Sequence, residues 1–121
     1  MFRVALAIFV LATTAFWPSS AAPAAVKLTG DATFFEPGLG ACGAFSSPND
    51  LIVALSPSDY AGGSHCFRHI LVNWQGRTVD ATVVDLCPSC NPGSIDLSPA
   101  AFQQLASLNA GRLTGVNWNF E

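Results

Sequence analysis

Two aspartates and two cysteines lie close together in one short stretch of this sequence, residues 83–102. Asp85 ends an apolar run, Cys87 and Cys90 follow in C-x-x-C spacing, and Asp96 stands just before a helix start. Two carboxyl groups about 5 to 9.5 Å apart can cleave a glycosidic bond, one as proton donor and the other as base or nucleophile. Asp96 is the candidate general acid, provided that burial raises its pKa.

Asp85 is a poor base for that reaction if it mainly orients Asp96 by hydrogen bonding. A site with an acid and no base binds and strains a chain without cutting it, which favours a protein that is not an enzyme. The alternative is that both aspartates are structural. They would then accept backbone N–H bonds, one in a loop and the other before a helix.

Four cysteines follow residue 25, namely Cys42, Cys66, Cys87 and Cys90. In an exported chain they predict two disulfides with three possible pairings. We expect Cys87 and Cys90 to bond to Cys42 and Cys66 rather than to each other, because two bridges between distant segments would brace the domain. A zinc site that combines the C-x-x-C pair with His65 and His69 is disfavoured by oxidation outside the cell. A thioredoxin-like role is disfavoured because no βαβ pattern surrounds the motif.

Residues 1–25 read as a secretory signal peptide, with Arg3 before an apolar run and small residues around a cleavage point between residues 21 and 25. The apolar run is shorter than the roughly 20 residues of a membrane span. We therefore expect a secreted protein without a membrane segment, in which residues 26–121 form one domain.

The net charge and the composition limit the classes of binding partner that we expect. Without Arg3, four basic residues face eight acidic ones, a formal charge of 4 − 8 = −4. Nucleic acid is excluded as a partner, because its phosphates are bound mainly by clustered Lys and Arg. No motif indicates a cofactor or a metal, and a surface with so few charges suits neutral polymers or proteins.

The hydrophobic pattern predicts a mainly β fold. Strands are expected at residues 26–35, 51–55, 67–74, 77–86 and 113–120, with a tight hairpin turn at Gln75 and Gly76. Alternation along 77–86 places Ala81, Val83 and Asp85 on one face. Ser-Pro pairs at 56–57 and 98–99 predict a single helical turn and one longer helix that ends near residues 109–111. Six or so short strands with these helices indicate a small β-barrel.

Four motifs in order carry a family resemblance: G-D-A-T-F-F at 30–35, A-C-G at 41–43, V-V-D-L-C-P-S-C at 83–90 and I-D-L-S-P-A-A-F at 95–102. They resemble the six-stranded double-psi β-barrel of expansin N-terminal domains, rare lipoprotein A-like domains, barwin-like proteins and plant natriuretic peptides. The chain is most similar to the small, secreted, single-domain expansin-like proteins of filamentous fungi. The resemblance implies a disulfide-braced barrel and a monomer.

In expansin-like domains an open groove receives polysaccharide, and the matching positions here are Thr33, Asp85 and Asp96. An aromatic residue that often follows the first aspartate is replaced by Cys87. Trp74, beside the hairpin turn, is a further candidate contact, with an edge packing role as the alternative. Family 45 glycoside hydrolases use the same barrel with a second aspartate after the first strand, and here Glu36 stands one place out of register.

The resemblance implies a protein that binds, and loosens without hydrolysis, a cell-wall polysaccharide such as cellulose, chitin or a peptidoglycan-like glycan. The alternative is a module directed at a secreted or host protein, either a protease inhibitor or a host-acting effector, with contacts on loops 36–41 and 56–65. A family 45-like endoglucanase is the third hypothesis.

Overall fold

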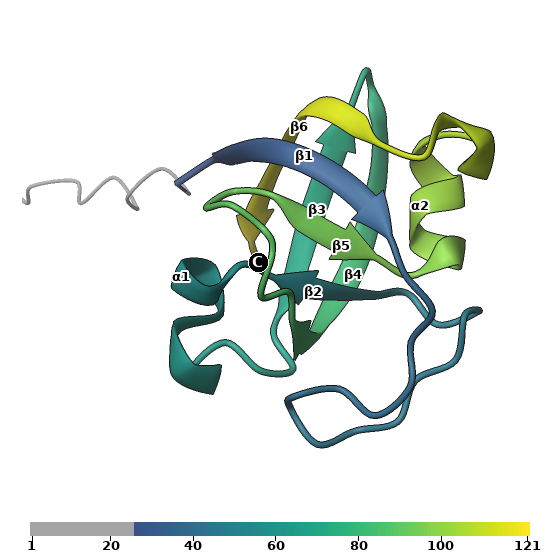
Figure 1. Cartoon of the computed structure of the whole chain (residues 1–121). Helices are drawn as coiled ribbons and strands as arrows, with labels where there is room; N and C mark the ends of the chain where they lie inside the picture. The colour runs from purple at the N-terminus through teal and green to yellow at the C-terminus, as the bar shows by residue number, and fades with distance from the viewer. Residues whose placement is uncertain (1–25) are drawn as a thin grey trace, which may run out of the picture.

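Six strands close into a barrel in the computed structural model, which describes residues 26–121 (Figure 1). The strands are β1 (Leu28–Phe34), β2 (Ile52–Leu55), β3 (His69–Trp74), β4 (Arg77–Leu86), β5 (Ile95–Leu97) and β6 (Leu113–Phe120). Their order around the barrel is β1-β5-β2-β4-β3-β6. The pairs β1·β5 and β2·β4 are parallel and the other four are antiparallel. The predicted mainly β, six-stranded, disulfide-braced barrel is confirmed.

Two short α-helices and two 3₁₀ turns accompany the strands: α1 (Pro57–Tyr60), η1 (Ala61–Gly63), α2 (Pro99–Leu105) and η2 (Leu108–Ala110). Both predicted helix starts are confirmed. The hydroxyl of Ser98 accepts a bond from the Ala101 N–H, and Pro99 occupies the first turn, where no N–H partner is needed. No helix in residues 26–121 is long and apolar enough to cross a membrane.

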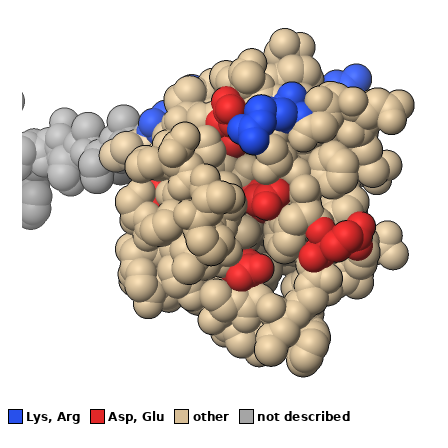
Figure 2. Space-filling view, in the orientation of Figure 1, with Lys and Arg blue, Asp and Glu red and all other residues tan. Residues whose placement is uncertain are grey.

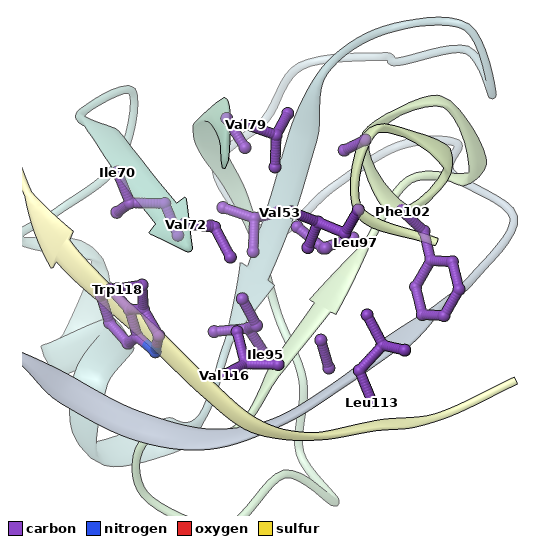
Figure 3. Packing of buried hydrophobic residues seen from close by; sticks show 14 of the residues in the cluster. Val53, Ile70, Val72, Val79, Ile95, Leu97, Phe102, Leu113, Val116 and Trp118 are labelled. Atoms are coloured by element: carbon purple, nitrogen blue, oxygen red, sulfur yellow. The ribbon is translucent and has the colours of Figure 1, made fainter. Parts of the chain in front are cut away.

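Alternate side chains of the strands fill the barrel, and α2 closes one end of it (Figure 3). Trp118 of β6 and Phe102 of α2 lie at opposite ends of the cluster in this view, and both are fully buried. The Trp118 indole donates to the Gly93 carbonyl at 2.8 Å, so the one polar atom of this large side chain has a partner.

One strand was not predicted, and the predicted end of the longer helix is wrong. The sequence pattern did not predict β5, because three residues between a Pro/Gly-rich loop and a proline are too few to show alternation. The longer helix stops at Leu105, before the predicted end, because Ala106 is extended (φ −159°). The chain then makes the separate turn η2. The predicted signal peptide and its cleavage point lie outside the described residues.

Candidate functional site

The strand register places Thr33, Asp96, Ala54 and Asp85 in one row across β1, β5, β2 and β4. Thr33 pairs with Asp96, and Ala54 pairs with Asp96 on one side and with Asp85 on the other. Paired residues of neighbouring strands point to the same face, and the residues on either side of Ala54 belong to the core. The row therefore faces away from the core, and the three groove positions named from the sequence share one surface.

The prediction that Asp85 shares a face with Ala81 and Val83 is wrong. Val53 pairs with Val83, but the next residue of β2 pairs with Asp85, so Val84 is an extra residue in β4. Such a bulge shifts the alternation by one position. It turns Asp85 away from the core and into the row.

Asp96 lines a polar pocket of about 180 Å³. The pocket is lined by Asp31, Thr33, Cys87, Ser89, Cys90, Asn91, Ser94, Ile95, Asp96 and Arg112. The Thr33 hydroxyl donates to Asp96 Oδ1 at 3.0 Å. Burial raises the pKa of Asp96 above its ordinary value, an effect that the Thr33 hydrogen bond opposes and the negative charge of Asp85 reinforces. The carboxyl group that was singled out as a proton donor is therefore half-buried and holds its proton more tightly than usual.

An ion pair forms the rim of this pocket. Arg112, just before β6, places Nη1 3.0 Å from Asp31 Oδ2 of β1. In the space-filling view the visible basic side chains are spread along the upper part of the molecule, one of them beside an acidic side chain, and the other acidic side chains lie lower (Figure 2). The positive charge of Arg112 also acts on Asp96, whose pKa it lowers. The carboxyl group that joins Asp96 in the pocket is thus Asp31, and it is already paired.

Asp85 holds the neighbouring loop. Its Oδ1 accepts the backbone N–H of Ala41 at 2.9 Å and that of Leu86 at 2.8 Å. These contacts match the structural interpretation of Asp85 as an acceptor of backbone N–H bonds. Glu36 is exposed and does not line the pocket.

The predicted disulfide pairing is wrong. Cys42 bonds to Cys66, and Cys87 bonds to Cys90. The backbone N–H groups of Cys42 and Phe67 donate to the carbonyls of Val84 and Val83, which brings the first two cysteines together beside β4. A turn in which the Cys90 N–H donates to the Cys87 carbonyl brings the other two to a Cα separation of 5.4 Å. All four cysteines are oxidised, so none offers a thiolate to zinc.

Trp74 lies outside the pocket. It ends β3, and its indole N–H donates to the Thr114 carbonyl at 3.0 Å. Its partly buried ring packs against the core cluster. This position fits the edge packing role that the sequence left open.

An apolar surface stands next to Asp85. Residues 39–45 form a small hairpin through the Leu39–Phe45 bridge, and Gly40 packs so tightly on the Val84 carbonyl that no side chain would fit there. Leu39 and Phe45 are 62% and 82% exposed, and Phe67, across the Cys42–Cys66 bridge, is 54% exposed. Phe67 also has a φ of +66°, which is costly for a bulky residue and is found mainly where surrounding structure enforces it. We call Leu39, Phe45 and Phe67 the apolar rim.

Sequence reasoning missed Arg112 and the small polar residues at 89–94 as parts of the pocket. In the sequence, Arg112 was counted only toward the net charge. Its position beside Asp31 depends on the pairing of β1 with β6, whose register runs from Leu28–Trp118 to Ala32–Leu113. No local signal in the sequence gives that register.

Comparisons with known proteins agree with this geometry. The papain inhibitor of Streptomyces mobaraensis is 37% identical over 117 residues, which cover 89% of this chain and 82% of the inhibitor. The solved structure of a Streptomyces papain inhibitor matches with a TM-score of 0.72 at 34% identity and covers 81% of this chain and 96% of the inhibitor. A variant of Clavibacter michiganensis expansin in complex with cellohexaose matches with a TM-score of 0.73 at 27% identity, over 79% of this chain and half of the expansin.

The family described as lytic transglycolase, a double-psi β-barrel family, matches residues 27–116. That match covers most of the described barrel, from β1 into β6. The chain belongs to this double-psi β-barrel family, whose relatives include expansins and a papain inhibitor.

Proposed function

We propose that this chain is a secreted protein that binds cell-wall polysaccharide in the pocket around Thr33 and Asp96 and loosens it without hydrolysis. The observation that carries the proposal is Asp96, a half-buried carboxyl group with a raised pKa in a pocket of small polar side chains. Ligand pockets for drug-sized molecules are mostly apolar and about 300 to 1,000 Å³. This smaller polar pocket suits the hydroxyl groups of a sugar at an exposed surface. The complex of the related expansin with cellohexaose supports the same ligand class.

The surroundings of Asp96 argue against hydrolysis. Hydrolysis needs a second carboxylate free to act as base or nucleophile. Asp31 is paired with Arg112, and one oxygen of Asp85 already accepts two backbone N–H bonds. Asp96 can then donate a hydrogen bond to a glycosidic oxygen while no partner completes the reaction.

The test is a pull-down of the protein with insoluble cellulose, chitin and whole cell walls, with released reducing sugar assayed in the same tubes. Asp96→Asn should lower the bound fraction severalfold, and Glu36→Gln, an exposed acid outside the pocket, should leave it unchanged. Neither sample should release sugar. Sugar release that Asp96→Asn abolishes would make the protein a hydrolase, and failure to bind any of these materials would overturn the proposal.

A second candidate function is inhibition of a papain-like protease, and the apolar rim favours it. Exposed aromatic and aliphatic side chains on a braced loop are typical anchors of protein interfaces. Here a disulfide and the hydrogen bonds to β4 hold the loop without any ligand, which lowers the cost of ordering it on binding. The relative named papain inhibitor supports this candidate.

Inhibition is tested by titrating papain with the protein and following hydrolysis of a peptide substrate. Tight inhibition that Asp96→Asn leaves intact would place protease binding outside the sugar pocket. Full papain activity at a large excess of the protein would exclude this candidate.

A further inference from the structure

Three potential metal ligands meet on the side of the barrel formed by β4, β3 and β6. The row that holds Thr33, Asp85 and Asp96 crosses β1, β5, β2 and β4 instead. The three ligands are His69 of β3, Asp80 of β4 and Glu121, which follows β6. One ligand atom from each residue lies within 4.8 Å of the others, and His69 Nδ1 is 2.6 Å from Asp80 Oδ1. No other group of three such residues converges in this way within residues 26–121.

The barrel backbone fixes these positions. In the β3·β4 pair, His69 lies opposite Thr82, and Asp80 lies opposite Leu71, so His69 and Asp80 are diagonal neighbours on the outer face. The Glu121 N–H donates to the His69 carbonyl at 3.0 Å, which continues the β3·β6 ladder. Convergence of the three residues therefore follows from strand register.

The two carboxyl groups of this cluster lack a strong cationic partner. Within the described chain, the ion pairs are His69–Asp80 and Arg112–Asp31, so neither carboxylate is paired with Lys or Arg.

The Arg68 guanidinium lies near this cluster, but the contacts that it makes are with other groups. It donates to the Glu121 backbone carbonyl at 3.4 Å, faces His65 Nδ1 at 3.1 Å and lies over the Phe120 ring, with 4.6 Å to the ring centre. Neither carboxylate oxygen of the cluster receives its charge. Two carboxylates this close repel each other, and a cation bound between them removes that repulsion.

We propose that His69, Asp80 and Glu121 form a binding site for a zinc-type divalent cation that ties the end of β6 to the β3–β4 hairpin. One imidazole nitrogen with two carboxylate oxygens is a donor set that zinc accepts, commonly with water as a fourth ligand. Calcium prefers six to eight oxygens, and magnesium prefers octahedral oxygen, so both fit this set poorly. The entering ion replaces the His69–Asp80 hydrogen bond. This inference is independent of the polysaccharide proposal.

The test uses protein without a polyhistidine tag, freed of metal with a chelator and titrated with zinc by calorimetry at neutral pH. We expect one saturable site, and a rise in unfolding temperature on zinc addition that the chelator reverses. Losing an outer-shell partner of a metal typically costs about 10- to 100-fold in affinity, so His69→Gln and Asp80→Asn, which remove ligands, should cost at least as much. Calcium at the same concentration should have no effect.

His65→Gln and Glu36→Gln are the matched controls, since they make the same chemical changes outside the cluster, and both should bind zinc as the original protein does. All four positions are on the surface or partly exposed, so the variants should fold, which circular dichroism checks. No saturable zinc binding, equal affinity in His69→Gln, or loss of binding in His65→Gln would each overturn the proposal. Equal binding of calcium would overturn the zinc-type assignment.

Discussion

The two disulfides brace two regions of different character. Cys42–Cys66 joins residues 24 positions apart and supports the apolar rim beside Asp85. Cys87–Cys90 joins residues 3 positions apart, and both of its cysteines line the polar pocket around Asp96. One bridge therefore links distant segments, and the other lies in the wall of the pocket. The partners proposed for the two regions differ accordingly, a protein at the apolar rim and a polysaccharide at the pocket.

Removing the longer bridge should have the largest effect on stability. The loop-closure estimate gives about 3.5 kcal/mol for a bridge across 24 positions and about 2 kcal/mol for one across 3. The Cys42→Ser/Cys66→Ser protein should therefore lose more free energy of unfolding than the Cys87→Ser/Cys90→Ser protein, as measured by urea unfolding. Equal losses, or the reverse order, would contradict the division of roles between the bridges.

Removing the shorter bridge should instead act on the pocket. Cys87→Ser/Cys90→Ser should weaken polysaccharide binding and leave any papain inhibition intact, because the apolar rim keeps its own bridge. Pull-down and inhibition assays on one preparation check this. Parallel losses in both assays would show that the two regions are not separable.

Phe45→Ala should have the opposite effect to the loss of the Cys87–Cys90 bridge, because it changes the apolar rim and not the pocket. The side chain is almost fully exposed, so its removal costs little stability, but loss of a central aromatic anchor typically weakens a protein interface by about 10-fold or more. Papain inhibition, if present, should fall by that factor while polysaccharide binding stays unchanged. Reduced polysaccharide binding would extend the sugar site onto the rim.

A smaller effect is expected from pH, since Asp96 is only half-buried. The folded protein holds the Asp96 proton to higher pH than the unfolded chain, so this group lowers stability as pH rises above its ordinary pKa of 3.8. Asp96→Asn removes that penalty, and its stability relative to the original protein should rise between about pH 3 and about pH 7. Urea unfolding at both pH values measures the difference, with Glu36→Gln as control. A relative stability that is constant or falls with pH would contradict the burial of this carboxyl group.

The smallest effect is expected at Trp74. Trp74→Phe keeps an aromatic ring against the core and loses the hydrogen bond to Thr114, so unfolding free energy should fall by about 1 kcal/mol. Polysaccharide binding in the pull-down should not change. A clear drop in binding would restore Trp74 to the sugar site.

The sequence was informative where the signal is local and uninformative where it depends on distant pairing. Alternation along 77–86 and the Ser-Pro helix starts predicted β4, α1 and α2 because each reflects its own neighbours. The bulge at Val84 puts Asp85 on the opposite face of β4 from the one that alternation predicts, and no residue type in the sequence signals the bulge. The prediction of the disulfide pairing was wrong for the same reason, since the approach of Cys42 to Cys66 depends on hydrogen bonds to β4. Thr33, Asp85 and Asp96 were found together through the family resemblance, and Arg112 was not.

The position of β1 in the barrel has a consequence for how the protein folds. Among the described strands β1 pairs with β5 and β6 alone, and its contacts with them join residues 63 and 88 positions apart. During synthesis or export β1 therefore has no partner until nearly the whole chain has emerged. Such distant pairing makes folding slow and leaves strand edges open to other chains meanwhile. The eight-residue strand β6 closes the barrel between β1 and β3, so shortening it should leave the edges of both strands open to other chains.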